Sequence, residues 1–205
     1  MADGTQSAPN SPAVQGVFGK LPARGDFVRI GLPGDFVAAW DGWLQQAVAG
    51  SRDLLGDAWQ SAFLEAPVWR FTLAPGLCGA GAVLGVVLPS VDSVGRYFPL
   101  TIAAIWPPVR RAAAPSREES AWLDAAADAG CAALEHDIAP DTLLARLTAP
   151  PATVSAPGSG SRWWTDGAPR VAAGGFSLPG LPDARGFAAM LDNAEAQTGH
   201  DWLEA

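Results

Sequence analysis

The sequence holds few of the side chains on which metal sites and thiol chemistry depend. Its 205 residues include two cysteines and two histidines. Cys78 and Cys131 lie far apart without a CxxC pairing, and neither His136 nor His200 has a second histidine at ligand spacing. We therefore expect no metal site, no histidine-dependent catalysis, and two free, buried thiols in a reducing compartment.

Positive charge is also scarce. The chain has 13 Lys and Arg against 21 Asp and Glu, a formal net charge of −8. Nucleic acids and anionic membranes both attract basic surfaces, so this balance argues against either partner. No stretch reaches the roughly 18 apolar residues of a membrane-spanning helix, and residues 1–12 lack the basic and apolar regions of a signal peptide. We therefore expect a cytoplasmic protein without membrane insertion.

Two glycine-containing stretches imitate nucleotide-binding motifs but depart from their spacing. In residues 16–20 (GVFGK), two residues rather than four separate the glycines, and Leu21 stands where a phosphate loop needs Ser or Thr. In residues 79–85 (GAGAVLG), the last glycine comes one place late and the glycines precede a predicted strand rather than a helix. We therefore expect no cofactor and no catalytic residues.

What the chain does contain is enough apolar sequence for a substantial core, since 49% of its residues are hydrophobic. We predict a disordered leader over residues 1–13 and a single domain over residues 14–205, with a Pro/Gly/Ser-rich loop at about 149–161. Hydrophobic periodicity and capping residues predict the following elements: strands at 14–18, 68–73, 82–88, 97–106 and 162–165, and helices that begin near Gly34, Ser51, Ser116, Pro140 and Asp183.

The order of these elements indicates the fold class. The strands at 82–88 and 97–106 are joined by an eight-residue loop, which makes them an antiparallel hairpin in the middle of the chain. A central hairpin argues against a doubly wound parallel sheet. We therefore predict an α/β fold with an antiparallel central sheet flanked by helices on both faces.

Two charged clusters lie in glycine-containing loops beside apolar strands, where function tends to be placed. Both clusters either tie their loops down through ion pairs or bind a partner. One cluster contains Lys20, which is the only lysine of the chain. The members of the two clusters are Lys20, Arg24, Asp26 and Arg29 in the first, and Asp92, Ser93 and Arg96 in the second.

Trp163 and Trp164 form a third candidate for partner binding. Because adjacent residues of a strand point to opposite faces, at most one of them belongs to the core on a given face. The other either covers the opposite face of the sheet or anchors a partner.

A further set of short motifs is spread along the chain. The motifs are GVFGKLPARGDFVR at 16–29, LP at 32–33, FV at 36–37, WDGWL at 40–44, DSVGRYFPLT at 92–101, WWT at 163–165 and LPGLP at 178–182. Together they resemble the TagF (ImpM) family of accessory proteins of bacterial type VI secretion. The resemblance covers residues 14 to about 190. The combination of motifs is specific, although no single piece would be.

The resemblance implies a fold akin to longin or profilin domains, an α/β/α sandwich. It also implies a cytoplasmic, non-catalytic protein that represses the secretion machine after translation by binding its forkhead-associated scaffold protein. The resemblance transfers no partner-contacting residues, so the charged loops are candidates from their chemistry alone. Two alternatives stay open. One is a small enzyme or ligand-binding protein that uses Lys20, Arg24, Asp26 and Arg96 on an anionic substrate, and the other is a structural subunit of the apparatus.

Overall fold

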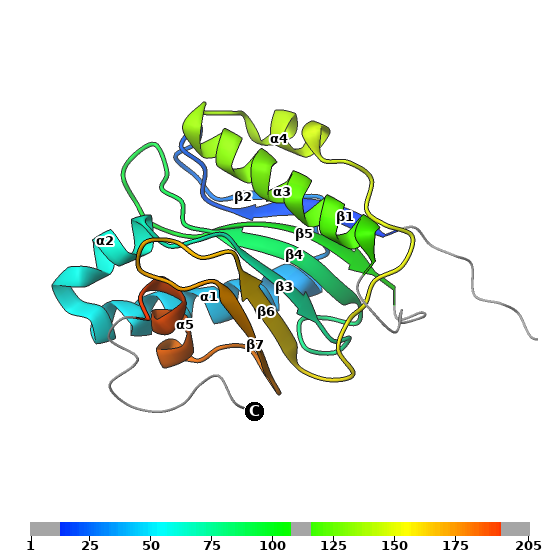
Figure 1. The fold of residues 1–205 in the computed structure, drawn as a ribbon. Coiled ribbons are helices and arrows are strands. Elements are labelled where there is room, and N and C mark those ends of the chain that lie inside the picture. The colour runs from blue at the N-terminus through cyan, green and yellow to red at the C-terminus, as the bar shows by residue number, and fades with distance from the viewer. Residues whose placement is uncertain (1–12, 108–115, 194–205) are drawn as a thin grey trace, which may run out of the picture.

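The computed structural model describes residues 13–107 and 116–193 (Figure 1). Residues 1–12 of the predicted leader lie outside the described residues. His200, near the other end of the chain, also lies outside them. Within the described part, the chain forms an α/β structure around one seven-stranded sheet. Every pair of neighbouring strands is antiparallel, as the central hairpin predicted.

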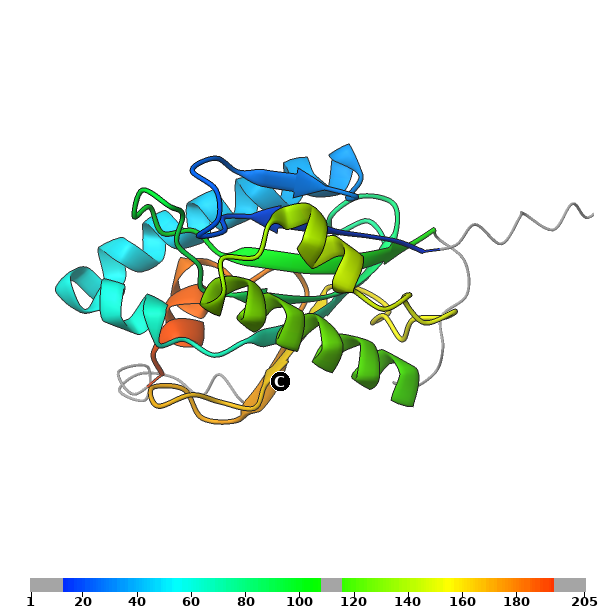
Figure 2. The same cartoon turned by 90° about the horizontal axis from the view of Figure 1, so that it is seen from above.

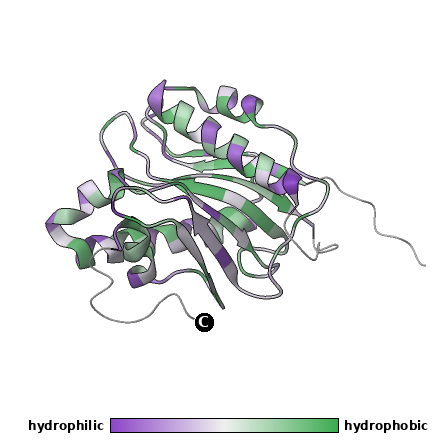
Figure 3. Ribbon diagram, in the orientation of Figure 1, coloured by the Kyte–Doolittle hydropathy of each residue, from purple (hydrophilic) through white to green (hydrophobic). Residues whose placement is uncertain are grey.

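The strand order across the sheet is β2-β1-β5-β4-β3-β6-β7. The central strands are apolar because both of their faces are covered, and Figure 3 colours them mostly hydrophobic. The strand bounds are β1 Val14–Gly19, β2 Val28–Ile30, β3 Trp69–Leu73, β4 Ala82–Leu88, β5 Leu100–Trp106, β6 Ser161–Thr165 and β7 Gly174–Leu178.

Five α-helices and one short 3₁₀ segment lie in the described part of the chain. The capping box predicted at Ser116 is confirmed, since Ser116 Oγ accepts from the Glu119 backbone N–H while the Glu119 carboxylate accepts from the Ser116 N–H. Asp183 caps the last helix as predicted. The bounds are α1 Gly34–Leu55, η1 Gly56–Ala58, α2 Trp59–Leu64, α3 Arg117–Glu135, α4 Pro140–Arg146 and α5 Ala184–Leu191.

The prediction of a separate helix beginning at Ser51 is wrong. Helix α1 runs unbroken from Gly34 to Leu55, and Ser51 is buried within it. The Ser51 hydroxyl donates to the Val48 carbonyl oxygen at 3.0 Å and accepts the indole N–H of Trp59 at 2.9 Å. The hydroxyl that looked like a helix cap therefore serves a tertiary hydrogen bond that holds η1 and α2 against α1.

Two strands lie where the sequence predicted none, and a third is shorter than predicted. Strand β2 lies within the charged run after Gly25, and β7 lies in a glycine-rich stretch before Pro179. Strand β5 begins at Leu100 rather than at residue 97. The residue before it, Pro99, has no N–H with which to extend a ladder.

Two hydrophobic clusters lie on opposite faces of the sheet, because alternate residues of the central strands join alternate clusters. In β4, Val83 and Val87 belong to the first cluster, while Leu84 and Val86 belong to the second. Helices α1, α2 and α5 contribute side chains to the first cluster, and α3 and α4 contribute to the second. Figure 2 looks down on α3 and α4, with the sheet behind them.

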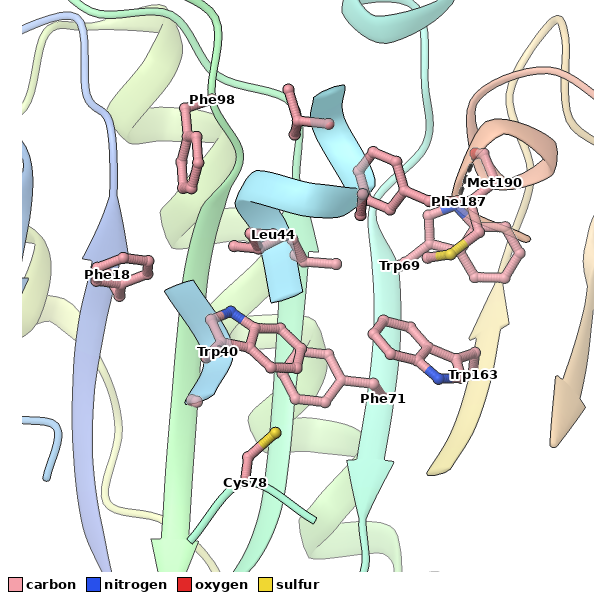
Figure 4. Close-up of a cluster of buried hydrophobic side chains, with 14 of the residues drawn as sticks. Phe18, Trp40, Leu44, Trp69, Phe71, Cys78, Phe98, Trp163, Phe187 and Met190 are labelled. Carbon is pink, nitrogen blue, oxygen red and sulfur yellow. Dashed lines mark hydrogen bonds between the residues drawn. The ribbon is translucent and has the colours of Figure 1, made fainter. Parts of the chain in front are cut away.

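The first cluster has a stack of aromatic rings at its centre (Figure 4). Trp40 of α1 is fully buried, and its ring stacks on Phe71 of β3 at a centroid distance of 4.7 Å. It also stacks on Phe36 at 5.5 Å. Its indole N–H donates to Thr101 Oγ1 at 2.9 Å, which satisfies the one polar atom the ring brings into the core. Trp163 of β6 extends the stack, 5.1 Å from Phe71.

No helix in the described ranges has the length and apolar character needed to cross a membrane. Between α4 and β6, residues 147–160 run without a helix or a named strand. This segment is nonetheless packed, since Val154 and Ala156 are buried against the second cluster.

Candidate functional site

The structure brings together the two charged loops that are far apart in sequence. Residues 20–27 connect β1 to β2, and residues 89–99 connect β4 to β5. Strands β1 and β5 are neighbours in the sheet, so these connections emerge at the same end of it. Ser90 Oγ donates to the Lys20 carbonyl oxygen at 2.7 Å, and the Ser93 N–H donates to the Arg24 carbonyl oxygen at 3.1 Å.

At the contact between the loops lies a buried carboxylate with two cationic partners. Asp92 Oδ2 pairs with Lys20 Nζ and accepts from Arg96 Nε at 2.7 Å. Asp92 Oδ1 accepts the backbone N–H groups of Arg96 and Val94, at 2.8 and 3.1 Å. The guanidinium of Arg96 also donates to the Gly25 carbonyl oxygen, which fastens the second loop to the first.

These contacts set the charge state of Asp92. Burial alone would raise the pKa of its carboxyl, but hydrogen bonds from Lys20 and Arg96 more than offset this effect. The pKa of Asp92 therefore lies well below its ordinary value, and the group stays ionised throughout the physiological range. The Lys20 side chain is 5% exposed and that of Asp92 is fully buried, so this pair is part of the protein interior.

The Phe27 ring packs against the buried lysine. Lys20 Nζ lies 4.7 Å from the centre of the Phe27 ring, and the ring meets Phe98 edge-on at 4.9 Å. Phe27 also stacks on Phe18 at 6.0 Å. Half of its surface is exposed, which is unusual for a ring with so many aromatic neighbours.

The outer ends of the loops and the adjoining strand β2 carry a group of exposed side chains that we call the loop-tip surface. Val94 is the most exposed large hydrophobic residue of the described chain, at 67%. The side chains of Arg24, Asp26 and Arg29 form no hydrogen bond or ion pair with any residue in 13–107 or 116–193. The loop-tip surface consists of Arg24, Asp26, Phe27, Arg29 and Val94.

The seven charged and polar residues named from the sequence divide into two groups. One of them, Arg29, lies in strand β2 and not in a loop as predicted. Lys20, Asp92 and Arg96 form the internal tie between the loops, and Ser93 joins it through its backbone. The remaining three, Arg24, Asp26 and Arg29, stay exposed at the surface. Phe27 and Val94 were not among the candidate site residues named from the sequence. Only their position between charged residues in a breaker-rich loop could have marked them as exposed apolar side chains.

The two tryptophans of β6 lie on opposite faces of the sheet, as strand alternation predicted. Trp163 is fully buried in the first cluster, where its indole N–H donates to Ser161 Oγ at 2.8 Å. Trp164 is half-buried at the margin of the second cluster. The Arg162 guanidinium lies 5.7 Å from the Trp164 ring.

The two thiols differ in their surroundings. Cys78 is buried in the first cluster, and burial raises the pKa of its thiol to about 12. Cys131 is half-buried, so the expectation of two buried thiols is right for Cys78 only. Burial and the nearby carboxylates of Glu135 and Asp128 raise the pKa of Cys131 as well. Both thiols are therefore poor nucleophiles at neutral pH.

The described residues offer little with which to hold a small ligand. No group of three or more His, Cys, Asp or Glu side chains in the described ranges could coordinate a metal ion. A recess between α2, β3, β4 and α5 has apolar walls that include Phe63, Trp69 and Phe187. It presents no polar atom that could orient a substrate.

Comparisons with known proteins agree on one relationship. Residues 16–149 match the family model described as the TagF N-terminal domain, type VI secretion system-associated. The fold is similar to the crystal structure of PA0076 from Pseudomonas aeruginosa PAO1, with a TM-score of 0.78 and 36% sequence identity. That match covers 87% of this chain and 94% of the other. A search among curated proteins found no match.

Proposed function

The chain belongs to the TagF family of type VI secretion system-associated proteins, and we propose that it is a non-catalytic regulator acting in the cytoplasm. In this proposal it represses the secretion machine after translation by binding the forkhead-associated scaffold protein of the system. We further propose that the loop-tip surface is where that partner docks. The same family resemblance implies a sandwich akin to longin or profilin domains, which stays a prediction.

One observation carries the proposal: the chain's only lysine is used internally. Lys20 and Arg96 both form ion pairs with the buried Asp92, so their charges hold the two loops together. The loops thereby become a fixed platform, and an ordered surface loses less entropy when a partner binds. An exposed aromatic ring and an exposed valine flanked by arginines have the composition of a protein-binding patch.

The same observation weighs against an enzyme or ligand-binding protein that uses these loops. Such a protein would need the Lys20 ammonium free to meet an anionic substrate, but Asp92 occupies it and the Phe27 ring packs against it. Arg24 and Arg29 are exposed, and neither lines the apolar recess described above. The third hypothesis, a structural subunit of the apparatus, also requires protein binding. It differs from the regulator in predicting a fixed stoichiometry with the apparatus.

The test measures binding of the purified chain to the purified forkhead-associated scaffold protein by titration calorimetry. Two variants alter the loop-tip surface without touching the internal tie: the double charge reversal Arg24→Glu/Arg29→Glu, and Val94→Asp. We expect each to weaken binding by about tenfold or more, as for residues near the centre of an interface. In cells, the same variants should raise secretion of the tube protein toward the level of a deletion strain.

Arg185→Glu is the matched control, because Arg185 is an exposed arginine on α5, outside the loop-tip surface. It should bind as the unaltered chain does. Absence of binding by the unaltered chain would refute the scaffold as the partner. Equal binding by the unaltered chain and both loop-tip variants would show that the interface lies outside the loop-tip surface. Co-purification at fixed stoichiometry with baseplate or membrane components would favour the structural subunit.

A further inference from the structure

The two edges of the sheet differ in how they are protected. Strand β2 forms one edge with only three residues, places the exposed Arg29 at its centre, and packs against α4. Short length, charge and a covering helix are the usual means of preventing an edge from pairing with another chain. Strand β7 forms the other edge with five residues, GGFSL, and has neither charge nor proline. In the described ranges, β7 pairs only with β6 (Figure 1).

The register of β7 shows which of its backbone groups are free to pair. A Cβ on Gly175 would lie 2.5 Å from the Trp163 carbonyl oxygen, and one on Gly160 would lie 1.9 Å from the Leu178 carbonyl oxygen. The Trp163 carbonyl oxygen therefore lies beside the N–H of Phe176, and the Leu178 carbonyl oxygen lies beside the N–H of Ser161. Trp163–Phe176 and Ser161–Leu178 are thus the hydrogen-bonded pairs. Because backbone direction alternates, the N–H and C=O groups of Gly175 and Ser177 point away from β6, toward the open edge.

The side chains beside this edge form a narrow strip on the face that carries the second cluster. Arg162 and Trp164 of β6 lie directly opposite Ser177 and Gly175 of β7. Both β7 residues are exposed, and neither has a side chain large enough to screen its β6 neighbour. Trp164 thus has an open side over Gly175, and Arg162 is an exposed cation with no ion-pair partner among the described residues.

We propose that the open edge of β7 accepts an extended segment of a partner protein as an eighth strand of the sheet. The segment pairs with the backbone of Gly175 and Ser177. It places an apolar side chain across Gly175 against Trp164 and a carboxylate near Arg162. That carboxylate starts two strand spacings, about 10 Å, from the Arg162 backbone, a span that two long side chains can close. The proposal is independent of the loop-tip surface, because β7 and β2 lie at opposite edges of the sheet.

A short segment fits this edge better than a second copy of the chain does. A stable dimer buries about 800 Å² on each partner, whereas the edge offers a strand of five residues and two side chains. Strand addition needs no such area, because main-chain hydrogen bonds provide the affinity and neighbouring side chains the specificity. A second copy would also bring its own Arg162 to the strip instead of the carboxylate that Arg162 lacks.

The test uses a displayed library of short random peptides selected on the full chain, and two substitutions at one position. Ser177→Pro removes the outward N–H and leaves every β6–β7 hydrogen bond in place, so the fold tolerates it. Ser177→Ala keeps the N–H and is the matched control. Selected peptides should bind the unaltered chain and Ser177→Ala alike, and bind Ser177→Pro about tenfold more weakly. They should be enriched in an acidic residue near an apolar one.

A second variant tests the proposal independently in case Ser177→Pro does not fold. Arg162→Glu should weaken the selected peptides, while Arg185→Glu should not. Peptide binding should also slow hydrogen exchange at the Gly175 and Ser177 amides. Three outcomes would overturn the proposal: peptides that bind the proline and unaltered forms equally, a dimer that Ser177→Pro abolishes, or full protection of both amides in the isolated chain. The last would mean that the chain itself covers the edge.

Discussion

Lys20 is the residue whose surroundings say most about this protein. It is the only lysine, and it forms an ion pair with Asp92, 72 positions away in sequence, which joins the two loops. Lysine is almost never fully buried unless it is paired, and here Asp92 and the Phe27 ring supply the pairing. Its role is therefore to fix the shape of the loops, which leaves recognition to the exposed side chains around it.

Replacing this lysine should destabilise the fold in a pH-dependent manner. Lys20→Met keeps the volume but leaves Asp92 buried with Arg96 as its only cationic side-chain partner, at a cost of about 3 kcal/mol in the free energy of unfolding. The pKa of Asp92 is lowered in the folded protein, so the pair stabilises the fold above the carboxyl's ordinary pKa of about 4. This stabilisation is lost as pH falls toward the depressed value.

Urea denaturation of both proteins at pH 7 and near pH 3 measures this difference. The gap between the unaltered chain and Lys20→Met should narrow at the lower pH. An equal gap at both values would mean that the loss comes from packing of the lysine stem rather than from its charge. The exposed Arg24→Ala is the control and should change the free energy of unfolding by less than about 0.5 kcal/mol.

Among the elements, helix α3 shows one side chain serving two segments. Glu119, which is 2% exposed, completes the capping box with Ser116. Its carboxylate also accepts the Ser155 hydroxyl at 2.6 Å and the Ser155 backbone N–H. The start of α3 is thus joined to the connection between α4 and β6, whose Val154 and Ala156 lie in the core.

Two substitutions at this helix start separate the cap from the anchor. Ser116→Ala removes only the cap and should lower the free energy of unfolding by about 1 kcal/mol. Glu119→Ala should cost about 2–3 kcal/mol, because it also leaves the polar groups of Ser155 without their acceptor. Thermal melts of both variants measure the difference. Equal losses would show that the contact with Ser155 contributes nothing to stability.

The elements that the sequence predicted well have local signals. The capping box at Ser116 and the long apolar runs of β4 and β5 are set by neighbouring residues, so they could be read directly. Strand β7 could not be read in this way, because glycines disfavour strands and its order comes from pairing with β6. Ser51 misled for a similar reason, since its partner, the Trp59 indole, becomes visible only in three dimensions.

The candidate site follows the same rule. The sequence identified Lys20, Asp92 and Arg96 as chemically notable, since charges in glycine-containing loops stand out. It did not predict that they meet, because their contact depends on β1 and β5 being neighbours in the sheet. It also left open which charges would be used internally, because that division follows from the burial of Asp92.

At the scale of the whole molecule, the sheet continues past the region that matches the TagF model. That region ends at residue 149, whereas β6, β7 and α5 follow it. Strand β6 pairs with β3, and Trp163 packs on Phe71. A fragment limited to residues 16–149 would therefore leave β3 as an edge with part of the first cluster uncovered.

We expect that fragment to aggregate, because a hydrophobic edge strand pairs readily with other chains. Size-exclusion chromatography of residues 16–149 beside residues 13–193 measures the effect. The longer form should elute as a discrete species, and the shorter one should elute in the void volume or be insoluble. A well-behaved, cooperatively melting shorter fragment would show that β6, β7 and α5 are dispensable for folding.

The pairing of β3 with β6 also has a consequence for the chain during its synthesis. Leu73 and its partner Ser161 are 161 − 73 = 88 residues apart. At translation rates of about 5–20 residues per second, the ribosome needs roughly 4–18 seconds to make the intervening chain. For that time the nascent protein carries β3 without β6, so ribosome-associated chaperones should engage it most strongly in that interval.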